Sequence, residues 1–141
     1  MIRQFKPIET PRPWGKEILV AKTDRYTGKV LIRTHDGTRA GLQYHPTRDE
    51  TFHVWTGRAI VYADRGDGVI ERRELKPGDS VYVPAGTAHS VETIGVSIMF
   101  EASHPIADGE IMSVPVEAQY RAQMRAFGAS RSVQDEEAVD A

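Results

Sequence analysis

The amino-acid sequence predicts an all-β fold, a sandwich or barrel, followed by one short helix. Short apolar segments recur along the 141-residue chain, and residues that favour turns separate them. Many short strands separated by glycine, proline and aspartate are typical of all-β sandwiches and barrels. Because no long helical segment alternates with these strands, a doubly wound α/β fold is not expected.

The predicted strands are apolar runs of three to seven residues. Turn signals that contain glycine lie between them, among them Thr27-Gly28 and Thr56-Gly57. In chain order the predicted strands cover residues 17–21, 29–33, 40–45, 51–55, 58–63, 69–75, 80–83, 90–92 and 96–101.

The chain divides into four predicted parts. Three prolines near the N-terminus remove backbone donors, which favours an extended arm. Near the C-terminus, Tyr120, Met124 and Phe127 recur at the spacing of one helix face, and Gly128 would end that helix. The predicted parts are an N-terminal arm over 1–15, a β-barrel over 16–114, a C-terminal helix over 115–128 and a flexible acidic tail over 129–141.

The composition excludes several classes of function. The 18 basic and 20 acidic residues leave a net charge of −2, so no basic excess indicates a nucleic acid or an anionic membrane as a partner. Without cysteine, the chain has no disulfide, no thiolate zinc site and no cysteine nucleophile. The apolar runs are far shorter than the ~20 residues of a membrane span, and the first residues lack the apolar core of a signal peptide. We therefore expect a soluble cytoplasmic protein.

The most informative residues form two patterns bounded by glycine. The first pattern runs from Gly37 through Gln43, His45 and Glu50 to Gly57. Gln43 and His45 are two residues apart on a predicted strand, so their side chains point to the same face. Glu50 begins the next strand and can face them across a hairpin.

The second pattern runs from Gly78 through Pro84 and Gly86 to His89 and Thr93. His89 follows a Pro-x-Gly turn, which directs its side chain back across the sheet. Together the two patterns supply two imidazoles, one carboxylate and one amide oxygen. Such a mixed set suits a divalent first-row metal with open coordination positions.

These two patterns resemble the two motifs of the cupin superfamily. Eight of the ten defining positions match; glutamine replaces the first histidine, and threonine replaces the final asparagine. The resemblance implies a double-stranded β-helix, or jelly-roll barrel, with a metal inside and usually with a homodimeric assembly. It also implies that the metal ligands are Gln43, His45, Glu50 and His89.

Further stretches are similar to the phosphomannose isomerase branch of the cupins, in particular to the C-terminal domain of type II mannose-6-phosphate isomerases. These stretches are Pro13-Trp14-Gly15, the segment from Gly37 to His45 and the segment from Lys76 to His89. In that branch Gln, His, Glu and His bind zinc. Zinc is therefore the expected metal, with manganese, iron, cobalt or nickel as alternatives.

Two further residues are expected to contact a substrate. Arg39 has the parity of the two ligand positions on its strand, so it can point into the barrel mouth and hold a phosphate or carboxylate. Phe52 has the parity of Glu50 and is expected to line the barrel, whereas His53 has the opposite parity and should lie outside.

The leading functional hypothesis is a metal-dependent enzyme that acts on a sugar or sugar phosphate, with aldose–ketose isomerisation as its reaction. The metal would hold the carbonyl and adjacent hydroxyl oxygens of the open-chain sugar and would stabilise the enediolate as a Lewis acid. A base would move the proton between adjacent carbons. Lys16 and Glu101 are candidates for this acid/base work, and the sequence does not identify the base.

Two alternatives stay open. One is an Fe(II) dioxygenase-type cupin, because the same mixed site with open positions can hold iron. Gln43 argues against it, since iron cupins more often use the full histidine set. The other is a non-catalytic cupin that binds a metal or small ligand, which the absence of an evident base favours. The expected partners are a small-molecule substrate and a second copy of the chain.

Overall fold

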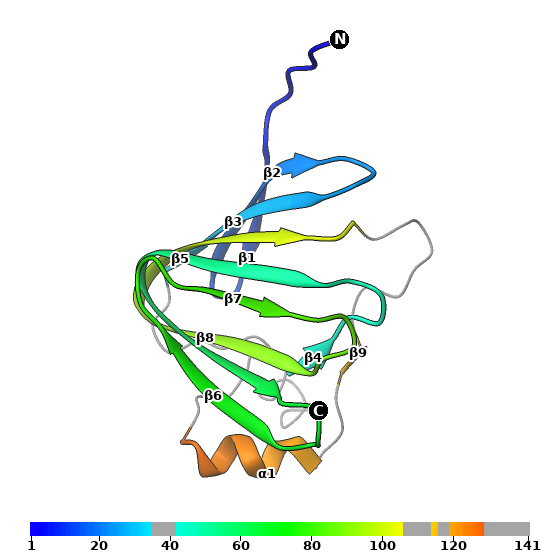
Figure 1. The fold of residues 1–141 in the computed structure, drawn as a ribbon. Coiled ribbons are helices and arrows are strands. Elements are labelled where there is room, and N and C mark those ends of the chain that lie inside the picture. The colour runs from blue at the N-terminus through cyan, green and yellow to red at the C-terminus, as the bar shows by residue number, and fades with distance from the viewer. Residues whose placement is uncertain (35–41, 106–113, 116–118, 129–141) are drawn as a thin grey trace.

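A computed structural model describes residues 1–34, 42–105, 114–115 and 119–128 of the chain (Figure 1). Within these ranges all strand pairs are antiparallel, which confirms the predicted all-β fold with one short helix. The described elements are β1 (Ile8–Arg12), β2 (Gly15–Lys22), β3 (Thr27–Arg33), β4 (Gln43–Tyr44), β5 (Glu50–Asp64), β6 (Ile70–Leu75), β7 (Ser80–Val83), β8 (His89–Ser103), β9 (Val114–Pro115) and α1 (Gln119–Ala126).

The strands form two layers because the two longest strands, β5 and β8, bend and take part in both (Figure 1). In the first layer, the beginning of β5 pairs with β7 and with the end of β8, and β3, β2 and β1 continue the sheet. In the second layer, the end of β5 pairs with β6 and with the beginning of β8, and β4 and β9 continue it. This arrangement is the jelly roll that the sequence predicts.

Gly57 lies where β5 passes from one layer to the other. The pairing of β5 with β8 shifts register on both sides of Thr56, and Gly57 has a φ of 79°. The sequence-based prediction of two strands, 51–55 and 58–63, separated by a turn is therefore wrong. Gly57, with its positive φ, forms part of a β-bulge. The bulge bends one continuous strand and does not reverse the direction of the chain. The separate strands predicted over 90–92 and 96–101 are likewise one strand, in which Gly95 has a φ of 71°.

Apolar side chains fill the space between the layers. As the alternation predicts, Phe52 and Val54 point inward and are buried, whereas Trp55 is exposed. A second apolar cluster lies on the outer face of the second layer, where α1 covers Ile60 and Tyr62 with Met124. The main core consists of Leu31, Phe52, Val54, Ala59, Val61, Leu75, Val83, Val91 and Met99.

The predicted N-terminal arm contains an edge strand. β1 pairs along its length with β2, and the residues before it project away from the barrel (Figure 1). The predicted tail over 129–141 lies outside the described residues. No helix within the described ranges is long and apolar enough to cross a membrane.

We predict that Gly57→Ala destabilises the fold more than Gly95→Ala. Both glycines have a positive φ, so either alanine costs about 1–2 kcal/mol in backbone strain. A Cβ at Gly57 would also collide with the backbone of Val96 and Ser97, whereas a Cβ at Gly95 meets nothing within 4 Å. This overpacking adds about 1–3 kcal/mol. Urea unfolding measures both values, and equal destabilisation by the two variants would contradict the close approach at the bend.

Candidate metal centre

Three candidate ligands come together from three places in the fold. His45 directly follows β4, Glu50 begins β5 in the first layer, and His89 begins β8 in the second layer. The backbone amide of Gly86 donates to the carbonyl oxygen of His45 at 2.8 Å. This bond ties the Pro84-Ala85-Gly86 turn to the end of β4, so the two histidine-bearing segments are held side by side.

The ligand atoms converge on the Glu50 carboxylate. His45 Nε2 lies 2.6 Å from Glu50 Oε1, and His89 Nε2 lies 3.7 Å from Glu50 Oε2. One possible ligand atom from each of the three residues lies within 4.8 Å of the others, and all three side chains are buried. The two imidazole centroids are 5.2 Å apart. Two ring nitrogens and a carboxylate are thus within reach of a single ion.

A hydrogen bond orients the His89 ring. Its Nδ1 lies 2.8 Å from the carbonyl oxygen of Thr87. Since a carbonyl only accepts, Nδ1 carries a hydrogen, which leaves Nε2, on the side of Glu50, as the nitrogen that could bind a metal ion. Metal-binding histidines are commonly held in this way by a carbonyl or carboxylate on the other ring nitrogen.

The charge on Glu50 is stabilised inside the barrel. Burial alone would raise the pKa of its carboxyl group, but the contacts with His45 and His89 lower it. Arg48, whose Nε lies 3.3 Å from Glu50 Oε1, adds a positive charge. The net result is a pKa well below the ordinary value, so Glu50 is a carboxylate at neutral pH.

The residues fit a divalent cation. Glu50 Oε1 is buried, and although His45 and Arg48 lie within ion-pair distance of it, neither makes a hydrogen bond of good geometry with it, nor does any other described residue. A buried carboxylate oxygen without such a partner is costly. A cation held by Glu50 and the two histidines would satisfy it, and imidazole with carboxylate is a donor set that zinc and other first-row metals accept.

The other predicted site residues have different positions. Gln43 is the register partner of His89 on the neighbouring strand, so the two side chains lie on the same face of the second layer. Phe52 is buried in the core, with its ring centroid 6.2 Å from that of His89. Arg39 lies outside the described residues. His53 points away from the centre and bonds to Ser80 on the outer face, with 2.7 Å between Nδ1 and Oγ.

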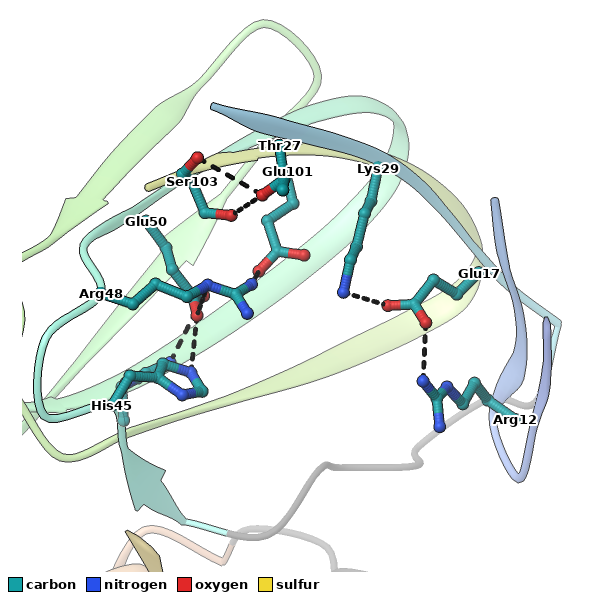
Figure 2. A network of polar contacts seen from close by, with 10 residues as sticks. Arg12, Glu17, Thr27, Lys29, His45, Arg48, Glu50, Glu101 and Ser103 are labelled. Atoms are coloured by element: carbon teal, nitrogen blue, oxygen red, sulfur yellow. Dashed lines mark hydrogen bonds and ion pairs between the residues drawn. The ribbon is translucent and has the colours of Figure 1, made fainter. Parts of the chain in front are cut away.

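The sequence does not predict Arg48 as a site residue, and it identifies Glu101 only as a weak candidate for acid/base work. Arg48 is buried and contacts both carboxyl groups: its Nε lies 3.3 Å from Glu50 Oε1, and its Nη2 donates to Glu101 Oε1 at 2.8 Å (Figure 2). Burial and the neighbouring charge of Glu50 raise the pKa of Glu101 to about 7. Lys16, the other acid/base candidate, lies on the surface and pairs with Glu9 at 3.4 Å. No local pattern marks Arg48, because it lies in the irregular segment between two strands.

The comparison with protein families finds one match that covers half of the chain. The family described as Cupin domain matches residues 30–100. Among curated proteins, a putative mannose-1-phosphate guanylyltransferase of Vibrio cholerae is 36% identical over 88 residues. The aligned region covers 62% of this chain but 17% of that protein, so the chain spans about a sixth of that relative's length.

Solved structures share the fold at low sequence identity. The capsular polysaccharide assembling protein CapF of Staphylococcus aureus superimposes with a TM-score of 0.68 at 20% identity, over 82% of this chain and 35% of that one. Oxalate decarboxylase of Bacillus subtilis, a protein with Mn(II) centres, superimposes with a TM-score of 0.61 at 23% identity, over 79% of this chain and 30% of that one.

We predict that His89→Gln strongly weakens metal binding, because an amide oxygen is a weaker ligand than an imidazole nitrogen, while His53→Gln does not. Both variants replace an imidazole by an amide, but only His89 faces the Glu50 carboxylate. Loss of one ligand is expected to weaken the affinity on the order of 100-fold or more, above the effect of losing a supporting residue. Titration with Zn²⁺ by calorimetry measures the affinity. Equal affinity of His89→Gln and the unmodified protein would show that these residues do not form the site.

Proposed function

This chain belongs to the cupin family, and from that premise we propose that it is a metal-dependent enzyme that acts on a sugar or sugar phosphate. The proposed reaction is aldose–ketose isomerisation. The observation that supports it most directly is the convergence of His45, Glu50 and His89 on one buried point between the layers.

We propose that Gln43, His45, Glu50 and His89 hold one divalent ion, zinc first among the candidates. When bound, such an ion supplies Lewis-acid polarisation of a substrate carbonyl. The protein's own contribution is orientation: the Thr87 carbonyl holds the His89 ring, and Arg48 holds the Glu50 carboxylate. The inward-facing Phe52 provides an apolar wall beside His89 that excludes water from that side.

The proposed substrate class is supported by the curated relative. That protein is named for an activity on mannose 1-phosphate, and the stretch that this chain matches is a small part of its length. We therefore propose a hexose phosphate of the mannose type as the first substrate to test. A stand-alone nucleotidyl transfer is not proposed, because the match covers 17% of the relative.

We predict that the purified protein contains about one divalent metal per chain and interconverts mannose 6-phosphate and fructose 6-phosphate. Removal of the metal with a chelator should abolish turnover, and Zn²⁺ or the native ion should restore it. Elemental analysis by plasma mass spectrometry and a coupled assay for fructose 6-phosphate measure the two quantities. The His53→Gln variant is the matched control and should retain both metal and turnover.

The alternatives give different outcomes in the same experiment. About one iron per chain, with oxygen consumption and without isomerisation, would replace the isomerase by a dioxygenase-type cupin. A bound metal without turnover of any aldose or aldose phosphate would leave a non-catalytic binding protein. Either result would contradict the proposed reaction while leaving the metal centre intact.

We also propose that two copies of the chain form a homodimer and that the outer face of the first layer is the contact surface. Apolar side chains from neighbouring strands are exposed there: Trp55 on β5 is 67% exposed, and Phe100 on β8, the register partner of His53, is 38% exposed. Tyr82 on β7 extends this surface, and no described helix covers it (Figure 1). An exposed apolar sheet face of this kind is typical of a protein–protein contact.

We predict that Trp55→Asp converts the dimer into a monomer. A buried charge at the centre of the contact has no partner there, so association should weaken by several kcal/mol. Val69→Asp, at an exposed position in the β5–β6 connection, is the control and should leave the dimer intact. Light scattering coupled to size-exclusion chromatography measures the mass. A Trp55→Asp protein that remains dimeric would place the contact elsewhere.

A further inference from the structure

A row of inward-facing side chains leads from the candidate metal centre across the first layer. Phe52 on β5 is the register partner of Glu101 on β8, and Glu101 is the register partner of Lys29 on β3. Register partners lie on the same face of a sheet. Glu50 is two residues before Phe52 and therefore lies on this face as well.

Burial decreases along this row. Glu101 is 6% exposed, the Lys29 side chain is 19% exposed, and Ile8, at the end of the row on β1, is 61% exposed. Lys29 thus lies between the buried metal centre and the exposed edge of the sheet.

Lys29 belongs to a small charged group that the metal centre does not need. Its Nζ lies 2.8 Å from Glu17 Oε1, and Arg12 Nη2 lies 2.7 Å from Glu17 Oε2 (Figure 2). Burial alone would raise the pKa of Glu17, but the bonds from Lys29 and Arg12 hold it below the ordinary value. Two cations therefore share the Glu17 carboxylate, and the other carboxyl group near Lys29 is its register partner Glu101, which pairs with Arg48.

We propose that Lys29, with Arg12, binds the anionic group of the substrate, a phosphate or a carboxylate at the end of a sugar chain. This inference deepens the proposed function and rests on it. In the free protein Glu17 holds the ammonium in place. In the complex the substrate anion takes part of that role, because ammonium and guanidinium groups form charge-assisted hydrogen bonds with phosphate and carboxylate oxygens.

The spacing of the strands suits a single sugar. Neighbouring strands lie about 4.8 Å apart, so the backbones of β3 and β5 are about 10 Å apart across β8. The Lys29 ammonium lies beside Glu17, on the β2 side of β3, and the carbonyl end of the sugar would lie at the point shared by His45, Glu50 and His89. An extended hexose with a terminal anion would therefore lie across β8 and β3, with its two ends at these two places. A neutral sugar would lose the contact with Lys29.

Three substitutions test the anion site in the purified protein with its metal, using inorganic phosphate as the probe. Lys29→Gln and Glu17→Gln break the same ion pair, so a purely structural role predicts that both variants change in the same direction. An anion site predicts opposite directions: Lys29→Gln weakens phosphate binding tenfold or more, and Glu17→Gln strengthens it severalfold. Lys16→Gln makes the same charge change on the outer face and should have no effect.

Calorimetry gives the affinity for phosphate, and metal analysis and a melting curve confirm that each variant is folded and loaded. The proposal is overturned if phosphate affinity changes in the same direction in the Lys29 and Glu17 variants, or if neither variant changes it. Since all variants keep the metal, phosphate bound to the metal contributes equally to each and cancels in the comparison.

A second set of probes separates this proposal from the proposed function. Mannose, mannose 6-phosphate and mannuronate differ in whether they carry no anion, a phosphate or a carboxylate. Lys29→Gln should weaken only the two anionic sugars, and the larger loss identifies which anion the site prefers. If Lys29→Gln leaves kcat/KM for mannose 6-phosphate unchanged, the anion site is overturned and the proposed isomerase is not. Opposite phosphate shifts without turnover of any sugar would overturn the isomerase alone.

Discussion

The bend of β5 and β8 from one layer into the other is the constraint on which the rest of the structure depends. The beginning of β5 lies in the first layer, whereas the beginning of β8 lies in the second. Folding one layer over the other places Glu50 opposite His89, although the two residues belong to different layers. The bend requires a bulge at Gly57, where the close approach of Val96 and Ser97 leaves no room for a side chain. The candidate metal centre is therefore a product of this bend.

The inner face of the first layer changes from apolar to charged between two neighbouring rows of side chains. Leu31, Met99 and Val54 are register partners and form an apolar row at the core. The next row along the strands, Lys29 to Glu101 to Phe52, carries charge. Buried charges reduce stability unless they are paired, and well-packed apolar residues would serve the fold at least as well. The charges in this row lie next to opposite charges, Lys29 beside Glu17 and Glu101 beside Arg48, and they are the basis of the proposed anion site.

Much of the fold could be predicted because it rests on local rules. Alternation of polar and apolar residues correctly placed Phe52 and Val54 inside and His53 on the outer face. The error was to treat Thr56-Gly57 as a chain reversal, since glycine with a positive φ serves a tight turn and a bulge equally well. Lys16 and Glu101 show a second limit. Both belong to strands, yet one lies on the outer surface and the other is buried, and only the pairing of β3 with β8 decides which face is inner.

The sequence by itself determined the chemical types at the centre and the spacing that delivers them: histidine, glutamate and glutamine at fixed intervals from glycine-bounded turns. It also determined the family, because those intervals are specific. Only the tertiary structure decided the neighbours of Glu50. One is Arg48, which lies in an irregular segment, and the other is Glu101, which lies on a strand more than 50 residues away. Arg48 bonds to Glu101 although 53 positions separate them in the chain. It also decided that Lys29 lies on the inner face. The reason is physical: side-chain alternation is a local property, whereas register between distant strands is set by the packing of the whole barrel.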